Sequence, residues 1–531
     1  MLLSVAAIAG VLVLASCTTS APSGPTSPTS PTTPTTPTEP TEPTTPSQLS
    51  GTITEAGSTT VQPLAEKFAN DFMEMHPEVT VTIQGGGSSV GVKSADDGTV
   101  DIGAASRELK SSEPPLVKHI LCRDGIAIVT EPGNTVSGLS KDQVMQIFAG
   151  EITSWSQVGG PSEDIIVVAR EEGSGTRAAF EEMVMDESLI TNMAILQPSN
   201  GAVRTTVATT PNSIGFLSFG YLDASVKVLA VDGVEATVAN VLNESYTIAR
   251  PLYFLTKEQP TGLVKEFIDY CLSVEAQAVV IEEGYISVAE LSGTITEAGS
   301  TTVQPIAEKF ANTFSAMFPN VTITIQGGGS SVGVKSADDG TVDIGAASRE
   351  LKSSEPPLVK HLLCRDGIAI VTDPANTVSG LTTEQVRYIF AGGITNWSEV
   401  GGPNEDIIVV AREEGSGTRA AFEEMVMDES LITNMAILQP SNGAVRTTVA
   451  TTPNSIGFLS FGYLDASVKS LAVDGVEGTV ENAKSGDYPI IRPLYFLTKE
   501  EPMGIVKVFL SFCLSSAGQA IAEGEGYISV K

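Results

Sequence analysis

Residues 165–185 read IIVVAREEGSGTRAAFEEMVM and set the class of fold. The apolar, β-branched run 165–170 is typical of a buried strand, and residues 177–185 have the periodicity of a helix. Between them lies the loop 171–176, which is rich in glycine and hydroxyl side chains. This order of strand, loop and helix is the unit from which α/β folds are built.

The same order occurs twice earlier in the chain. We expect a strand at 52–54 followed by a helix from Val61 onward. A second strand is expected at 79–83, followed by a helix over 90–96 that one of the serines at 88–89 would cap. Strands that alternate with helices predict α/β layers with mainly parallel sheets.

Each of the three loops lies between a strand and the start of a helix. Unpaired backbone N–H groups and the positive end of the helix dipole meet there, which suits an anion. Arg107 and Arg170 lie beside these loops and could match the charge of a dianion; the alternative is a salt bridge with Glu108, Glu171 or Glu172. The loop donors are Ser58, Thr59, Thr60, Ser88, Ser89, Ser174, Gly175 and Thr176.

Composition and motifs exclude several classes of function. The 531 residues include 63 Asp and Glu against 30 Lys and Arg, a formal charge of −33 that disfavours nucleic acid and anionic membrane surfaces as partners. There are only 3 His, and we find no Walker phosphate loop, no Gly-x-Ser-x-Gly elbow and no Cys/His metal spacing. We therefore expect no metal, no cofactor and no enzymatic activity, with an exported phosphatase as the enzyme alternative.

A tandem repeat organises most of the chain. The segment Gly51–Thr60 recurs at Gly293–Thr302, and the offset of 242 holds to the end with 44 differences in 240 aligned positions. This period is far longer than a solenoid unit, so each copy should fold as a separate body. We assign one module to residues 49–290 and a second to 291–531.

The amino terminus has the pattern of an exported lipoprotein. An apolar run ends in Leu14-Ala15-Ser16-Cys17, which resembles a lipobox, so residues 1–17 are expected to be a signal peptide with lipidation at Cys17. An uncleaved anchor or a buried helix is the alternative. The expected basic region before the apolar run is missing and would lie upstream. Residues 18–48, rich in Thr and Pro, should form an extended stalk on the outer face of the membrane.

Four further cysteines fall two in each repeat. They are Cys122 with Cys271, and Cys364 with Cys513. An oxidising compartment would allow one disulfide per module. Buried free thiols are the equal alternative, because the sequence carries no pairing geometry.

Four motifs in order resemble one known family. They are Ala56 to Thr60, Gln84 to Gly91, Val100 to Arg107 and Arg170 to Thr176. Together they resemble the phosphate-binding protein of the phosphate ABC transporter, often called PstS. The resemblance covers each repeat from end to end. The resemblance implies a type II periplasmic-binding-protein fold, with two lobes and a hinge, that closes on phosphate.

In the first module, lobe one would comprise residues 50–127 and 250–291, and lobe two residues 128–249, with strands at 125–130 and 251–255 as crossings. By motif, Arg170 would be the charged clamp. The candidate phosphate-binding residues are Ser58, Thr59, Thr60, Ser88, Ser89, Ser106, Arg107, Arg170, Ser174, Gly175 and Thr176, and in the second copy Ser300, Thr301, Thr302, Ser330, Ser331, Ser348, Arg349, Arg412, Ser416, Gly417 and Thr418.

One position departs from the family pattern. The best-known members place an Asp after the Gly-Ala-Ser segment to accept a hydrogen bond from protonated phosphate, whereas Ser106 and Arg107 occupy that region here. We therefore expect a site for a dianion. The implied function is capture of inorganic phosphate and delivery to an ABC permease. The alternatives are another oxyanion (sulfate, molybdate or tungstate), or a surface phosphate sensor or adhesive protein.

Overall fold

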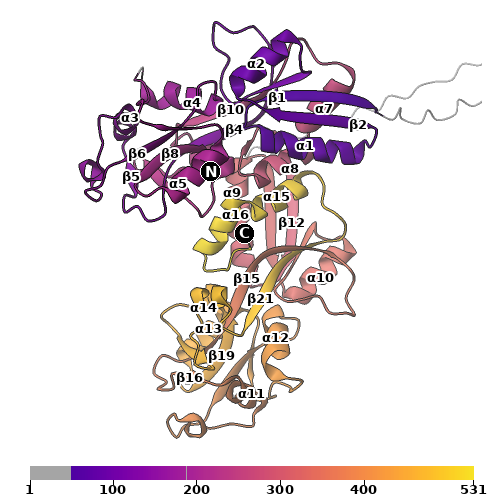
Figure 1. Ribbon diagram of the computed structural model, residues 1–531. Coiled ribbons are helices and arrows are strands. Elements are labelled where there is room, and N and C mark those ends of the chain that lie inside the picture. The colour runs from indigo at the N-terminus through magenta and orange to yellow at the C-terminus, as the bar shows by residue number, and fades with distance from the viewer. Residues whose placement is uncertain (1–48, 187, 531) are drawn as a thin grey trace, which may run out of the picture. The chain divides into compact units, whose positions relative to one another are not determined.

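The computed structural model of the chain describes residues 49–186 and 188–530. The signal peptide, Cys17 and the stalk at 18–48 lie outside the described residues and stay expectations. The rest contains two copies of one α/β module, and each copy is built around a mixed sheet. Figure 1 gives the element labels used below.

The sheet of the first module combines parallel and antiparallel pairs. The lobe strands pair in parallel, as predicted, but the strands that join the lobes are antiparallel, so the sheet is mixed rather than mainly parallel. The strand order is β2 (Val79–Gly85), β1 (Gly51–Gly57), β3 (Ile102–Ala105), β10 (Ala249–Thr256), β4 (Val117–Thr130), β8 (Ser213–Ser218), β6 (Ile166–Arg170) and β7 (Ile195–Gln197), with β5 (Gly138–Leu139), β9 (Lys227–Val231) and β11 (Ile286–Ser287) off this path.

Two strands cross between the lobes. The first part of β4, Val117 to Gly125, pairs with β10, and its last part, Ile126 to Thr130, pairs with β8 in the other lobe. In Figure 1, β4 and β10 lie between the group around β1 and β2 and the group around β6 and β8. The two predicted strands exist, but 125–130 pairs within lobe two and 251–255 pairs within lobe one, so the crossing lies at the ends of these runs, near Gly125 and Ala249. These strands are the hinge of a type II binding fold.

Helices cover both faces of the sheet. In lobe one, α1 (Gln62–Met75), α7 (Gly262–Cys271) and α8 (Val274–Glu282) share one apolar core, and α2 (Ser88–Asp97) forms another with β3 and β10. The apolar core of lobe two contains Trp155 and the stacked rings of Phe180 and Phe216. Its helices are α3 (Lys141–Ala149), α4 (Gly175–Phe180), α5 (Asn200–Thr209) and α6 (Val238–Leu242), with short turns η1 (Trp155–Val158), η2 (Glu181–Met185) and η3 (Phe219–Tyr221).

Two helix starts differ from the sequence prediction. The N-cap of α2 is Gly87, at φ 90°, and not a serine, so Ser88 becomes the first helical residue and its hydroxyl remains free for other partners. Helix α4 begins at Gly175 rather than 177, with Ser174 as its capping residue, and continues into the π-helical turn η2. Both differences shift loop residues onto helix N-termini.

The second module repeats these elements with the same sheet order, except that a single bridge between Arg365 and Ile528 takes the place of strand β11. Its strands are β12 (Gly293–Gly299), β13 (Val321–Gly327), β14 (Ile344–Ala347), β15 (Val359–Thr372), β16 (Gly380–Leu381), β17 (Ile408–Arg412), β18 (Ile437–Gln439), β19 (Ser455–Ser460), β20 (Lys469–Val473) and β21 (Ile491–Thr498). Its helices and turns are α9 (Gln304–Met317), α10 (Ser330–Asp339), α11 (Thr383–Ala391), η4 (Trp397–Val400), α12 (Gly417–Phe422), η5 (Glu423–Met427), α13 (Asn442–Thr451), η6 (Phe461–Tyr463), α14 (Val480–Ser485), α15 (Gly504–Leu514) and α16 (Ser516–Gly524).

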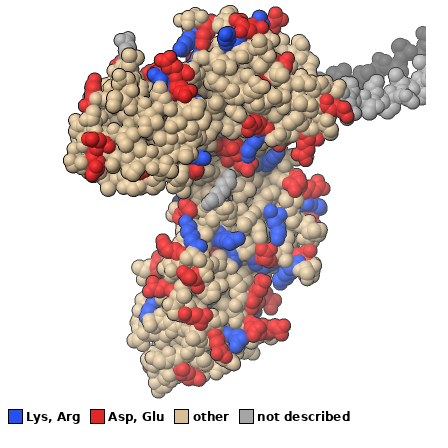
Figure 2. Space-filling model, viewed as in Figure 1, with Lys and Arg blue, Asp and Glu red and all other residues tan. Residues whose placement is uncertain are grey.

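The structure also shows the state of the four cysteines, and it can be searched for metal-binding groups and for helices that could span a membrane. Cys122, Cys271, Cys364 and Cys513 are buried free thiols in this structure. Within residues 49–186 and 188–530, no group of His, Cys, Asp and Glu could hold a metal ion. No single helix in the same ranges is long and apolar enough to cross a membrane; α15 and α16 reach that length only together, with a bend of 59° between them. Figure 2 shows acidic side chains in small groups over the visible face, with fewer basic ones among them.

Candidate anion-binding site

Lobe one brings three serines together where its strands end. Ser58 follows β1, Ser88 begins α2 and Ser106 follows β3, and all three are buried. The Ser58 hydroxyl donates to Ser106 Oγ at 2.9 Å, and the Ser106 backbone N–H donates to Ser88 Oγ at 3.0 Å. Parallel strands of one sheet end at the same edge, which places ligands there. These hydroxyls form one half of the site.

Lobe two supplies the other half from the loop after β6. Ser174, Gly175 and Thr176 are buried at the N-terminus of α4. Ser174 Oγ already accepts the backbone N–H of Arg177, so this side chain can offer only its own proton to a ligand. Helix α4 has only six residues. Its contribution to anion binding therefore comes from the side chains and N–H groups at its start, which meet lobe one.

The two halves touch each other directly. The Thr60 hydroxyl lies 2.9 Å from the Thr176 hydroxyl, and the Ser89 N–H donates to the carbonyl of Gly173 at 3.2 Å. A Cβ at Gly175 would lie 2.1 Å from Ser88 Oγ, so only glycine allows this approach. The lobes are therefore closed on one another, and the predicted loop residues from both lobes are in contact.

Arg170 is the charged group at the centre of this contact. It is only 2% exposed, and its guanidinium donates to Thr59 Oγ1 at 3.0 Å and to the carbonyls of Gln197 and Pro198. Among the described residues it forms no ion pair with a carboxylate. Burial lowers the pKa of Arg170 to about 10, with a further lowering by Arg250, so the group is still charged at neutral pH. A buried, unpaired cation is costly, and a bound anion would relieve that cost.

A second buried arginine comes from the hinge. Arg250 on β10 is 3% exposed; it pairs with Asp124 at 2.8 Å and donates to the Ser106 carbonyl at 3.1 Å. The other carboxyl oxygen of Asp124 accepts from Ser218 and from the Phe219 N–H. Burial raises the pKa of Asp124, against the opposing charge of Arg250. Two arginines and one aspartate leave one excess positive charge in the closed cleft.

Sequence reasoning missed Arg250, Asp124 and a third residue, Asn200. The Asn200 amide donates to Thr60 Oγ1 at 2.9 Å and is fully buried. A signal for it existed, because Pro198 and Ser199 join β7 to the start of α5 at Asn200, which is another order of strand, loop and helix. Arg250 and Asp124 had no comparable signal, since they lie on the hinge strands.

Arg107 and Ser89 lie at the edge of the site rather than inside it. The Arg107 guanidinium pairs with Glu113 at 2.6 Å and donates to Ser89 Oγ at 3.4 Å. The alternative expected from the sequence was a salt bridge with Glu108, Glu171 or Glu172. The carboxylate that pairs with Arg107 is that of Glu113. From Glu108, Arg107 contacts the backbone carbonyl and not the carboxylate. This arginine holds the pKa of Glu113 below its usual range. Both side chains line a cavity of about 320 Å³ beside Ser174 and Arg177.

The second module reproduces this geometry. Arg412 donates to Thr301 Oγ1 at 3.1 Å, and burial lowers its pKa to about 10. Thr302 and Thr418 lie 3.0 Å apart, and Arg349 pairs with Glu355. Ser300, Ser330 and Ser348 form the same hydroxyl cluster, Ser416 caps α12 in front of Gly417, and Ser331 accepts from Arg349. The chain thus holds two equivalent candidate sites.

A buried glutamate stands behind the first loop of each module. Glu55 on β1 is 2% exposed and Glu297 on β12 is 1% exposed. Glu55 Oε2 and both carboxyl oxygens of Glu297 make no hydrogen bond within the described chain. Burial raises the pKa of each to about 8, with a smaller contribution from a nearby glutamate. These carboxyls are therefore protonated in the folded protein at neutral pH.

Replacing Glu55 and Glu297 by Gln should change how stability depends on pH. The folded pKa of about 8 is above the ordinary 4.5, so the folded chain keeps protons that the unfolded chain loses between these values. Wild-type stability should fall as pH rises from 5 to 8, by up to about 1.4 kcal/mol per pH unit for each group. The double variant should lose this slope in thermal unfolding measured across that range. An exposed control, Glu78→Gln, should retain it; equal slopes in all three proteins would contradict the assignment.

Comparison with known proteins places this geometry in a family. The model of the PBP superfamily domain matches residues 40–275 and 287–517. Phosphate-binding protein PstS 2 of Streptococcus agalactiae is 40% identical over 256 residues, which cover 44% of this chain and 87% of the relative. PstS of Bacillus subtilis is 36% identical over 251 residues, with 46% and 83% covered. The crystal structure of an ABC-type phosphate transport receptor from Vibrio cholerae is 36% identical and covers 44% of this chain and 99% of its own, with a TM-score of 0.40.

Fold and site together define a solute-binding protein of the type II periplasmic class, with two lobes and a hinge in each module. Each single relative spans less than half of the chain because the module is present twice. The chain belongs to the PstS family of phosphate-binding proteins, in a tandemly duplicated form.

Proposed function

We propose that each module binds one inorganic phosphate ion in the closed cleft between its lobes. The observation that carries this proposal is a buried arginine that has no carboxylate partner among the described residues, Arg170 in one module and Arg412 in the other. Hydroxyls from both lobes surround each arginine. They can turn their protons toward a tetrahedral oxyanion, as the resemblance to the family implies.

The binding energy available from these donors is sufficient. A hydrogen bond to a charged group contributes roughly 1.5–3 kcal/mol. Four or five such bonds exceed the ~8 kcal/mol that corresponds to micromolar affinity. The overall charge of −33 acts at the surface and is screened over about 8 Å in physiological salt. Local donors therefore decide binding in the closed cleft.

The groups that line the cleft favour the doubly charged form of phosphate. Ser106 stands where the best-known members have an aspartate, and both oxygens of Asp124 are occupied by Arg250, Ser218 and the Phe219 N–H. No carboxylate oxygen of the described cleft is free to accept a proton from the ligand. The one proton of HPO4²⁻ can be donated to a serine or threonine hydroxyl oxygen. Without a carboxylate acceptor the cleft does not require that proton, which keeps sulfate, molybdate and tungstate as competing ligands.

Isothermal titration of the full chain tests the assignment. We expect phosphate to bind with a stoichiometry of two per chain and micromolar or tighter affinity. Sulfate, molybdate and tungstate should be titrated in parallel at the same pH. Absence of heat with phosphate below millimolar concentration, or tighter binding of another anion, would overturn the choice of ligand.

The location and the partner complete the proposal. A lipid on Cys17 and the Thr/Pro stalk at 18–48 would hold both modules outside the membrane, and an ABC permease would receive the phosphate. Mass spectrometry of the mature amino terminus tests lipidation, and a Cys17→Ser variant should be released from the membrane. Phosphate uptake in a deletion strain tests delivery. Unchanged uptake would favour the alternative, a surface phosphate sensor, which the tandem arrangement also fits because a permease receives one binding body at a time.

A further inference from the structure

Helix α8 of the first module is buried on more than one side. Its residues 276–281 are all buried, six of its nine, whereas only three residues of the equivalent α16 are buried. Val279 and Val280 pack into the core of their own lobe. Ala278 and Ile281 instead belong to the apolar cluster of the second module. A helix that buries residues on more than one side needs a partner on each of those sides, and α8 therefore has a second partner.

That partner is α15, with α9 beside it. Helix α8 contacts α15, and α6 contacts α9. Ile281 lies in one apolar cluster with Val508 and Phe512 of α15, and the three side chains are 3%, 0% and 2% exposed. Leu291, in the segment between the modules, is buried in the same cluster.

The first module carries polar groups at the positions equivalent to α15. Val508 corresponds to Glu266, which is exposed on α7. Phe512 corresponds to Tyr270, whose hydroxyl donates to Asp71. Three more acidic residues of the first copy have neutral equivalents in the second copy. Asp71, Asp269 and Glu275 correspond to Thr313, Ser511 and Ala517, respectively. The second copy lacks these charges on the side that meets the first.

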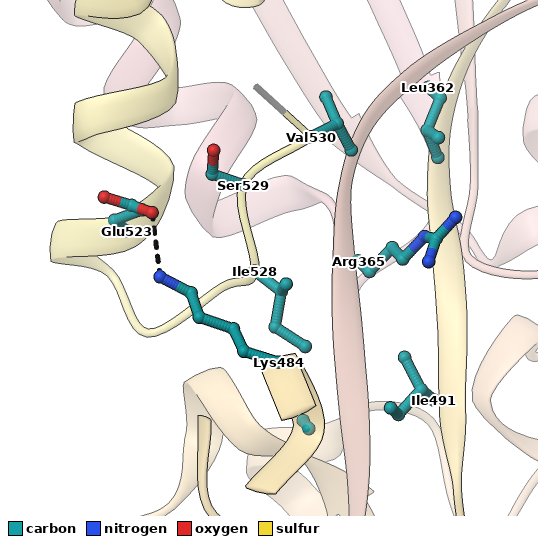
Figure 3. Close-up of a pocket in the computed structure, with 9 residues that line it drawn as sticks. Leu362, Arg365, Lys484, Ile491, Glu523, Ile528, Ser529 and Val530 are labelled. Atoms are coloured by element: carbon teal, nitrogen blue, oxygen red, sulfur yellow. Dashed lines mark hydrogen bonds and ion pairs between the residues drawn. The ribbon is translucent and has the colours of Figure 1, made fainter. Parts of the chain in front are cut away.

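The opposite exchange occurs on the face that the first module offers. Ile281 corresponds to Glu523 and Leu242 corresponds to Lys484. Figure 3 shows Lys484 and Glu523 joined by an ion pair beside a cavity of about 550 Å³, and the pair is 2.9 Å long with side chains 47% and 48% exposed. In the second module this face remains charged and in water.

The differences between the copies are concentrated in the helices that carry these surfaces. Helices α1, α6, α7 and α8 contain 38 of the 240 aligned positions but 19 of the 44 differences. Residues 163–227, in contrast, are identical to 405–469. These helices therefore hold a disproportionate share of the divergence between the copies.

We propose that the α6/α8 face of the first module, with Ala278 and Ile281 at its centre, and the α9/α15 face of the second, with Val508 and Phe512 at its centre, are a dedicated interface that joins the modules into one rigid unit. A contact between different faces of similar bodies is head-to-tail and would continue into a filament unless its ends are blocked. The charged residues Glu266 and Asp269 at one end, and Lys484 and Glu523 at the other, block it. Terminal units of repeat proteins use polar outer faces for the same purpose.

An exchange of residues between the copies tests the interface in the full chain. Ile281→Glu with Val508→Glu places two carboxylates in the contact, and each substitution is one that the other module already accommodates at the equivalent position. We expect cleavage by a Glu-specific protease at Glu290, next to the buried Leu291, to accelerate at least tenfold, and the radius of gyration in solution scattering to increase. Phosphate titration should still give two sites, which shows that both modules remain folded.

The reciprocal exchange tests the blocked ends. Glu266→Val, Lys484→Leu and Glu523→Ile together give the free faces the residues of the interface. We expect concentration-dependent association in sedimentation velocity, where the wild type stays a monomer under the same conditions. Unchanged cleavage and scattering in the first variant, or a monomeric second variant, would overturn the proposal. Neither result depends on phosphate being the ligand.

Discussion

Replacement of Arg170 and Arg412 by Ala in one chain is expected to abolish phosphate binding. Each arginine is buried, bonds to a threonine hydroxyl of the opposite lobe and has no carboxylate partner in the described chain. Loss of two charge-assisted hydrogen bonds corresponds to about 3–6 kcal/mol per site. This weakens binding about a hundredfold to ten-thousandfold, which titration calorimetry measures directly.

The single variants give the sharper result. Arg170→Ala alone should leave one site of wild-type affinity, so the stoichiometry should fall from two to one, and Arg412→Ala should do the same. Arg123→Ala, an exposed arginine on hinge strand β4, is the matched control and should keep both sites. Full stoichiometry in a single variant would contradict two independent sites that each rest on this arginine.

Gly175→Ala together with Gly417→Ala is expected to weaken phosphate binding at both sites through closure alone. The added Cβ would lie 2.1 Å from the hydroxyl of Ser88 or Ser330, and 2.4 Å from that of Ser106 or Ser348, across the two lobes. Overpacking of this kind costs roughly 1–3 kcal/mol, so the dissociation constant should rise about 10- to 100-fold. No charge is removed, and neither glycine has a positive φ that alanine would avoid.

A matched control for the glycine variant exists within the chain. Gly133 has open space around its would-be Cβ, and the second copy carries Ala375 at this position. Gly133→Ala should leave affinity and thermal stability unchanged. If the Gly175 and Gly417 variant binds phosphate as tightly as this control, the close approach of the lobes does not contribute to affinity.

Much of the site was predictable because its parts are local. A strand, a glycine- and serine-rich loop and a helix stand together within about 20 residues, as in 165–185, so periodicity and turn residues reveal them. The repeat then assigns the second set at a fixed offset. The hinge was predictable as well, since two apolar strands flank the middle section, and β4 and β10 are those strands.

Residues joined over long sequence distances were not predictable. Arg250 meets Asp124 across 126 positions, and Asn200 meets Thr60 across 140. Arg107 stands beside the correct loop, but its position among the motifs did not reveal that its guanidinium turns to Glu113. Which polar groups meet depends on how the lobes close, and no local pattern encodes that.

The sequence by itself determined the α/β class, the two modules and the family. The class follows from the local periodicity of 165–185 and of the two earlier strand–loop–helix units, the modules from the repeat at an offset of 242, and the family from the order of the four motifs. Only the tertiary structure decided which charges are buried together and which faces of the two copies meet. The physical reason is that burial and pairing arise between segments far apart in the chain. Glu266 and Val508, or Glu523 and Ile281, are mere differences between copies until the fold places one of each pair in water and the other in an apolar contact.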